Sequence, residues 1–100
     1  MGRKQNMESE FSGKIVLVTG ATSGIGRASV LRFAEAGASI AAVGRNEAAL
    51  ATLAKEIEGI GGKALTLRAD LSVGRDIGLV VSQTMNRFSG IDILVNAGPY

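Results

Sequence analysis

The sequence predicts an α/β fold with a doubly wound parallel sheet, because short apolar runs typical of strands alternate strictly with amphipathic helical segments. The order is β-α-β-α-β-α-β, and short turns join the elements. Parallel strands with right-handed crossovers place helices on both faces of the sheet. We expect the strand order 3-2-1-4, with a ligand crevice at the carboxyl ends of strands one and four.

The first strand and helix are expected over about residues 14–19 and 24–36. The strand carries the run IVLV, which is typical of a strand buried on both faces. Gly37 is a typical helix-ending residue. The inward stripe expected for this helix is Ala28, Leu31, Phe33 and Ala34.

The second strand is expected over residues 39–43, and Asn46 is placed to cap a helix over about 47–60. Gly61 and Gly62 end that helix. The apolar face expected for it is Leu50, Leu53, Ala54 and Ile57.

The third strand is expected over residues 64–68, followed by a helix over about 73–88 that Ser72 would cap. The fourth strand is expected over residues 91–95. The inward stripe expected for the third helix is Ile77, Val80, Val81, Met85 and Phe88.

Composition and charge narrow the function classes for this single domain of 100 residues. The chain has no cysteine and no histidine, so we expect no disulfide, no thiolate metal site and no metal ligation by histidine. A net charge of +2 with scattered basic residues and 4% aromatics disfavours nucleic-acid binding. We expect residues 1–12 to be a flexible polar tail, with Phe11 packing on the domain edge. No signal peptide or membrane-length apolar run is visible, so we expect a soluble cytoplasmic protein.

Three glycines lie between the first strand and the first helix, in the segment TGATSGIG. Gly20 allows a tight turn, Gly24 lets the backbone approach a pyrophosphate, and Gly26 lets helix and strand pack closely. Glycines in an ordinary loop are the alternative. The strand before and the helix after favour a phosphate site, because a helix amino terminus presents backbone N–H groups and positive charge.

Arg45 follows the second strand, about where an acidic residue would bind a ribose 2′-hydroxyl and select NAD. A guanidinium at this place can grip a 2′-phosphate with two hydrogen bonds, whereas a carboxylate would repel it. We therefore expect NADP(H) rather than NAD(H) as the cofactor. The alternative is an arginine of a solvated turn.

These motifs together resemble the classical short-chain dehydrogenases/reductases. The resemblance rests on TGATSGIG, on GRN at residues 44–46, on Asp70-Leu71 and on DILVNAG at residues 92–98, so it covers nearly all of residues 13–98. In character the sequence is most similar to the 3-oxoacyl-carrier-protein reductase-like branch. The resemblance implies a Rossmann-like fold, with residues 13–100 forming part of an NADP-binding domain.

The resemblance also assigns roles to the matching positions. It places Thr22 near the adenosine ribose, the 2′-phosphate on Arg45, and the adenine amino group on Asp70. Asp70 is alternatively a turn or capping residue ahead of Ser72, and Asn96 alternatively forms a strand-end turn. The resemblance implies that the pyrophosphate is surrounded by Gly20, Ser23, Gly24, Ile25 and Gly26. The other contacts that it implies are Leu71 beside the adenine, with Asn96, Ala97 and Gly98 lining the ribose and bracing the sheet.

The chain departs from the family pattern in two places. It carries one asparagine at Asn96 where members usually carry two. Its only tyrosine is Tyr100, so the family's tyrosine with a lysine four residues later has no counterpart, nor has the serine that polarises the substrate carbonyl. We therefore assign no catalytic residue.

The resulting interpretation is the cofactor-binding half of an NAD(P)-dependent oxidoreductase acting on a carbonyl or alcohol substrate in a longer form. The alternative is an inactive truncated form that binds nucleotide or associates with full-length subunits. We expect the chain on its own to be marginally stable and either to self-associate or to be partly molten, because the fourth strand would be an exposed sheet edge.

Overall fold

The computed structural model describes residues 10–97 and confirms the expected alternation of strands and helices. The largest boundary difference is at the fourth strand, which begins at Ile93 rather than Ile91. Among the described residues, no helix is long and apolar enough to span a membrane. The elements are β1 (Ile15–Thr19), α2 (Gly24–Glu35), β2 (Ser39–Gly44), α3 (Glu47–Gly59), β3 (Lys63–Arg68), α4 (Gly74–Phe88) and β4 (Ile93–Asn96).

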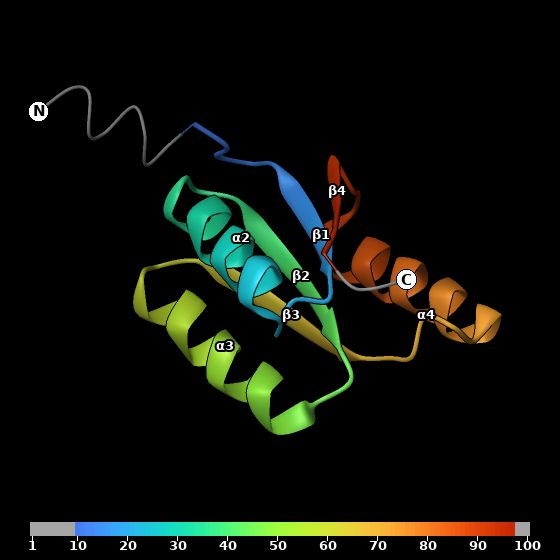
Figure 1. Cartoon of the computed structure of the whole chain (residues 1–100). Helices are drawn as coiled ribbons and strands as arrows, with labels where there is room; N and C mark the ends of the chain where they lie inside the picture. The colour runs from blue at the N-terminus through green and yellow to red at the C-terminus, as the bar shows by residue number, and fades with distance from the viewer. Residues whose placement is uncertain (1–9, 98–100) are drawn as a thin grey trace, which may run out of the picture.

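The four strands form one parallel sheet in the order β3-β2-β1-β4, as the sequence predicts. Helices α2 and α3 lie side by side over one face of this sheet, and α4 lies on the other (Figure 1). The doubly wound architecture is therefore confirmed. The carboxyl ends of β1, β2 and β3, with the turns that follow them, meet along one edge of the molecule.

Alternate residues of the inner strands supply the two halves of the core, because successive strand side chains point to opposite faces. Val16 and Val18 of β1 face α2 and α3, whereas Leu17 faces α4. The core under α2 and α3 includes Val30, Ile40, Ala42, Leu50, Leu53 and Ile57. The three largest side chains that α3 turns inward, Leu50, Leu53 and Ile57, are those predicted from the sequence.

The expected stripe of α2 is partly wrong. Ala28 is exposed, and the buried residues of this helix are Gly26, Val30 and Ala34. These three follow one another at four-residue spacing, so they mark the line along which α2 lies closest to the sheet. Leu31 and Phe33 flank this line and are partly buried.

The expected stripe of α4 is also partly wrong. Ile77, Val81 and Met85 are 48%, 42% and 46% exposed, whereas Val80 and Thr84 are buried. The helix contacts the sheet along positions 80, 84 and 88, and the stripe at 77, 81 and 85 is rotated away by about 100°. The buried Thr84 hydroxyl has a hydrogen-bond partner in the core, because it donates to the Val80 carbonyl oxygen over 2.7 Å.

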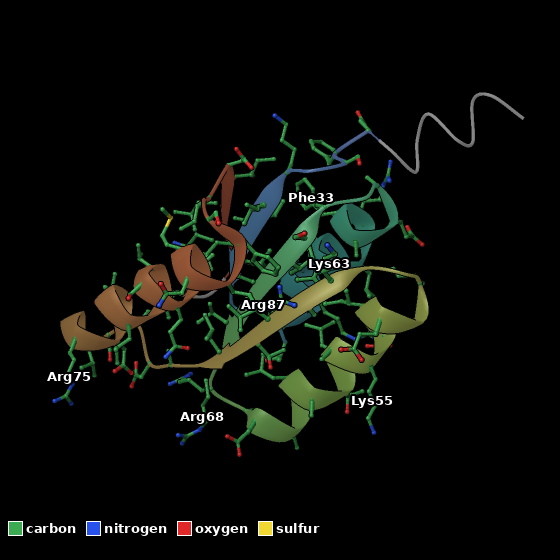
Figure 2. The ribbon with its side chains drawn as sticks, turned by 180° about the vertical axis from the view of Figure 1, so that it is seen from behind. Phe33, Lys55, Lys63, Arg68, Arg75 and Arg87 are labelled. Atoms are coloured by element: carbon green, nitrogen blue, oxygen red, sulfur yellow. The ribbon has the colours of Figure 1, made fainter. Side chains whose placement is uncertain are left out.

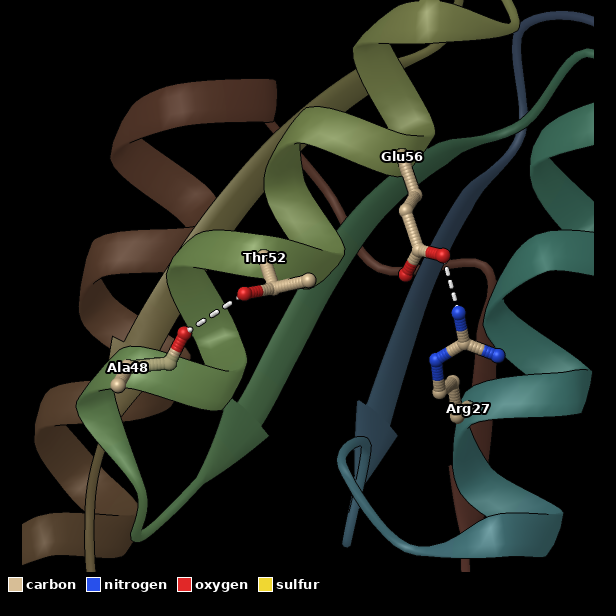
Figure 3. A network of polar contacts seen from close by, with 4 residues as sticks. All are labelled: Arg27, Ala48, Thr52 and Glu56. Atoms are coloured by element: carbon tan, nitrogen blue, oxygen red, sulfur yellow. Dashed lines mark hydrogen bonds and ion pairs between the residues drawn. The ribbon is translucent and has the colours of Figure 1, made fainter.

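Two side-chain contacts hold the helical layer formed by α2 and α3. Phe11 packs edge-to-face on Phe33 with ring centroids 5.1 Å apart, as expected for the domain edge; residues 1–9 lie outside the described range. The guanidinium of Arg27 on α2 pairs with the carboxylate of Glu56 on α3 (Figure 3). The second contact ties the helix after the glycine turn to the helix after Arg45.

Candidate functional site

The glycine-rich turn between β1 and α2 is closed by its own hydrogen bonds. Gly20 has a φ of 65°, a left-handed conformation that glycine adopts without strain. The Ser23 hydroxyl donates to the Gly20 carbonyl oxygen over 2.7 Å and accepts from the Gly26 N–H over 3.2 Å. Ser23 is thus the N-cap of α2, and the turn and the helix start are one rigid unit.

Gly26 and Gly24 have opposite surroundings, although both lie in the first turn of α2. A Cβ added at Gly26 would lie 1.9 Å from the Gly20 carbonyl oxygen, so only glycine fits there. A Cβ added at Gly24 would meet nothing within 4 Å. Gly26 therefore serves the packing of α2 on the turn, while the space beside Gly24 is open to a ligand.

The amino terminus of α2 offers hydrogen-bond donors to that space. Within the described chain the N–H groups of Gly24 and Ile25 have no acceptor, because the first turn of a helix lacks internal partners and Ser23 satisfies only Gly26. The Ile25 side chain is 76% exposed. Open space, free amides and the positive end of the helix dipole fit a phosphate group here.

The end of β2 lies beside the glycine turn. The Ala21 N–H donates to the Val43 carbonyl oxygen over 2.9 Å, and a Cβ added at Gly44 would come within 3.3 Å of the Thr22 hydroxyl oxygen. Thr22 is therefore partly buried between the turn and β2. Arg45 follows immediately, so the structure brings it next to the glycine-rich turn.

The Arg45 side chain is exposed and makes no ion pair among residues 10–97. Asn46 caps α3, as predicted, because its side-chain oxygen accepts from the Ala49 N–H over 3.0 Å. The N–H of Ala69, after β3, donates to the Gly44 carbonyl oxygen over 3.0 Å. This bond holds Asp70 at the same edge as Arg45.

Asp70 forms a turn ahead of α4. Its Oδ1 accepts from both the backbone N–H (3.0 Å) and the hydroxyl (2.7 Å) of Ser72. The hydroxyl bond, then the backbone bond, and more weakly the positive charge of Arg45, hold the pKa of Asp70 below its usual value. The Asp70 carboxyl is therefore ionised at neutral pH, and the positive charge of Arg45 favours this ionised form.

The predicted capping role of Ser72 is wrong. The N-cap of α4 is Val73, which makes no side-chain capping bond. The Ser72 hydroxyl is occupied by Asp70 two residues earlier, in the local side-chain turn that aspartate favours.

We predict that Ser72→Ala raises the pKa of the Asp70 carboxyl, because the largest cause of its lowering is removed. A lowered folded-state pKa stabilises the fold above the unfolded pKa, and this contribution is lost as pH falls through the folded pKa. The variant should therefore lose stability at neutral pH and differ less from the parent in acid. Carboxyl NMR titration and unfolding at two pH values measure both effects; an unchanged Asp70 titration would contradict the prediction.

The carboxyl ends of β1 and β4 are joined by side chains as well as by the sheet. The Thr19 hydroxyl donates to the Asn96 side-chain oxygen over 2.7 Å, and the Ala97 N–H donates to the Thr19 carbonyl oxygen over 3.1 Å. Asn96 is thus held against β1 in register with Thr19. The predicted residue Gly98 lies outside the described residues.

Leu71 follows Asp70 in the chain and is partly buried. It lines an apolar hollow of about 300 Å³ between α4 and the ends of β1 and β4. The other lining residues are Leu17, Thr19, Ile77, Val80, Val81, Leu94 and Asn96.

The structure therefore gathers the glycine turn, Arg45 and Asp70 along one edge, with Asn96 at the other side of β1. The sequence reasoning missed Thr19, which braces Asn96, and Asp76, whose Oδ2 accepts from the Asp70 N–H over 3.0 Å. An acidic residue in the first turn of a helix is the signal that could have identified Asp76.

The sheet order and the turn after β1 define a Rossmann-like α/β domain. The family model of the short chain dehydrogenases matches residues 14–99. The chain belongs to the short-chain dehydrogenase family, whose members bind NAD(P) dinucleotides.

Individual proteins agree with this assignment. A short chain dehydrogenase of Pseudocercospora fijiensis is 44% identical over 92 residues, which are 92% of this chain and 30% of that protein. A crystal structure of a short-chain type dehydrogenase/reductase from Mycobacterium marinum is 43% identical, with a TM-score of 0.81 over 84% of this chain and 34% of that one. NAD⁺-bound xylitol dehydrogenase is 34% identical, with a TM-score of 0.82 over 85% of this chain and 33% of that one. The chain thus spans about a third of the length of these relatives.

Proposed function

We propose that this chain is the cofactor-binding part of an NADP(H)-dependent oxidoreductase that acts on a carbonyl or alcohol. The observation that carries the cofactor choice is Arg45, which lies exposed and without an ion-pair partner in the described chain, beside the glycine turn. A carboxylate here would accept hydrogen bonds from the ribose hydroxyls of NAD, whereas this chain has a guanidinium at that place.

Each part of the cofactor has a matching group in this arrangement. The free amides of Gly24 and Ile25, with the Ser23 cap, would hold the pyrophosphate at the start of α2. Arg45 would hold the 2′-phosphate, and Asp70 would accept from the adenine amino group. The bound nicotinamide would supply or take up the hydride. Thr22 near the adenosine ribose, Leu71 beside the base, and Asn96 with Ala97 and Gly98 lining the ribose complete the proposed site.

The activity itself we assign to a longer protein. The relatives are about three times as long, and the 100 residues contain no tyrosine followed by a lysine at four residues. We propose that these residues alone bind a dinucleotide without turnover, as a domain over residues 13–100. The 3-oxoacyl-carrier-protein reductase-like branch and a cytoplasmic location stay proposals from the sequence.

Titration with NADPH and NADH tests the proposal, with the quenching or enhancement of nicotinamide fluorescence as the readout. We expect NADPH to bind about 100-fold more tightly, because charge-assisted hydrogen bonds to an added phosphate contribute about 1.5–3 kcal/mol. Tighter binding of NADH would overturn the choice of NADP(H). Failure of both to bind would overturn dinucleotide binding.

Self-association is the second proposed property of these residues. Within residues 10–97 strand β4 pairs only with β1, and its Leu94 side chain is 63% exposed beside the exposed flank of α4. An open strand edge with apolar neighbours favours pairing between chains. We predict concentration-dependent sedimentation that Leu94→Lys abolishes, while Lys55→Glu on the outer face of α3 leaves it unchanged; a monomeric parent chain would contradict this.

A further inference from the structure

The turn between β3 and α4 is closed from both ends by hydrogen bonds. From the strand side, the Asp70 carbonyl oxygen accepts from the Val73 N–H over 3.0 Å, and Asp70 Oδ1 accepts the two bonds from Ser72. From the helix side, Asp76 Oδ2 accepts from the Asp70 N–H over 3.0 Å. Asp70 is therefore held through its amide, its carbonyl and one carboxylate oxygen.

Asp76 is the residue that links this turn to α4. It lies in the first turn of the helix, where a carboxylate interacts favourably with the positive end of the helix dipole. The N-cap of α4 is Val73, which makes no side-chain capping bond. The Asp76 side chain accepts instead from the N–H of Asp70, six residues earlier.

One oxygen of the Asp70 carboxylate is left for a ligand. Oδ1 takes both bonds from Ser72, whereas Oδ2 has no hydrogen-bond partner in residues 10–97. The carboxylate lies partly exposed at the same edge as Arg45. An ionised carboxylate oxygen only accepts hydrogen bonds, so it favours a ligand that presents a donor at that point.

We propose that Asp76 is a positioning residue for recognition of the cofactor's base: it anchors the Asp70 backbone, so that the free Asp70 oxygen meets the exocyclic amino group of adenine. This inference rests on the proposed dinucleotide site, and it adds a residue that does not itself touch the ligand. Without the Asp76 bond the Asp70 N–H loses its acceptor, and the turn loses its only side-chain hydrogen bond with α4 among the described residues.

The choice of base gives a readout specific to this role. Hypoxanthine carries a carbonyl oxygen where adenine carries the amino group, so a carboxylate held at that place accepts from adenine and repels hypoxanthine. A general loss of stability in a variant would lower the affinities for both dinucleotides equally. A loss of positioning at Asp70 would lower only the ratio between them.

The experiment compares the affinities of the full chain for NADPH and for its hypoxanthine analogue. We expect the parent chain to prefer NADPH by about tenfold, the worth of one hydrogen bond to a charged group. Asp76→Ala should lower this ratio to about threefold or less by releasing Asp70. Asp76→Asn should keep the ratio, because its amide oxygen still accepts from the Asp70 N–H. Glu58→Ala, an exposed carboxylate on α3, is the matched control.

The outcomes separate this inference from the proposed function. If the parent binds both dinucleotides equally, or if Asp76→Ala keeps the parent's ratio, the positioning role is wrong and the dinucleotide site stands. If the parent binds neither, the proposed function itself fails. Should Asp76→Ala not fold, Asp76→Ser provides the same comparison, since its side chain is shorter and suits a first helical turn.

Discussion

Replacing Gly26 with alanine is expected to destabilise the chain by about 3 kcal/mol, at the upper end of what overpacking costs. The new Cβ would lie 1.9 Å from the Gly20 carbonyl oxygen and 2.8 Å from its carbon, and neither backbone atom can swing aside as a side chain does. Helix α2 must therefore move away from the turn, which also pulls the Gly24 and Ile25 amides out of line. Urea unfolding and NADPH titration would measure the two losses.

Gly24→Ala is the matched control, because it adds the same methyl group two residues earlier where nothing lies within 4 Å. Its stability should equal or slightly exceed that of the parent, since alanine costs less backbone entropy in a helix. Its affinity for NADPH should nevertheless fall, because the methyl group occupies the space proposed for the pyrophosphate. Equal stability of the Gly26→Ala variant and the parent would refute the steric argument, and unchanged affinity of Gly24→Ala would refute the phosphate site.

Arg45→Asp is expected to weaken NADPH binding by about 100-fold or more, since it removes a charge-assisted contact and adds a repelling charge at the 2′-phosphate. NADH lacks that phosphate and should bind at least as well as before, because the new carboxylate can accept from the ribose hydroxyls. The ratio of the two affinities is therefore expected to invert. Titrating both dinucleotides against the parent and the variant measures it.

Lys55→Asp controls for the change in net charge. Lys55 lies on the outer face of α3 and points away from the sheet (Figure 2), and the substitution alters the total charge by the same amount. It should change both affinities little, because an exposed charge far from a ligand is screened by salt. An equal loss of NADPH affinity in the two variants would mean that Arg45 acts through net charge alone and binds no phosphate.

The fold was largely predictable because its signals are local. Apolar runs such as residues 15–18 read as buried strands, and Gly37 and Asn46 mark helix ends by their own backbone and side-chain chemistry. Where the prediction failed, the reason was competition between neighbours. Ser72 is of a residue type that caps helices, but its hydroxyl donates to the carboxylate of Asp70, two residues earlier.

The helix faces were harder to predict than the helices. Ile77, Val81 and Met85 of α4 form an apolar stripe as regular as that of α3, yet they are about half exposed, and a threonine occupies the buried line instead. Periodicity gives the angle between residues on a helix but not which line contacts the sheet. That line depends on how α4 packs against the strands.

The sequence by itself determined the order of elements, the strand order and the turn that suits a phosphate, because each follows from local periodicity and from the rules of parallel crossovers. Only the tertiary structure decided how close the packing at Gly26 is, since a Cβ there would lie 1.9 Å from the Gly20 carbonyl oxygen whereas one at Gly24 would meet nothing within 4 Å. It also decided that Asp76 holds Asp70 and that Thr19 holds Asn96. These contacts join residues six and seventy-seven positions apart, and their partners are set by packing rather than by spacing along the chain.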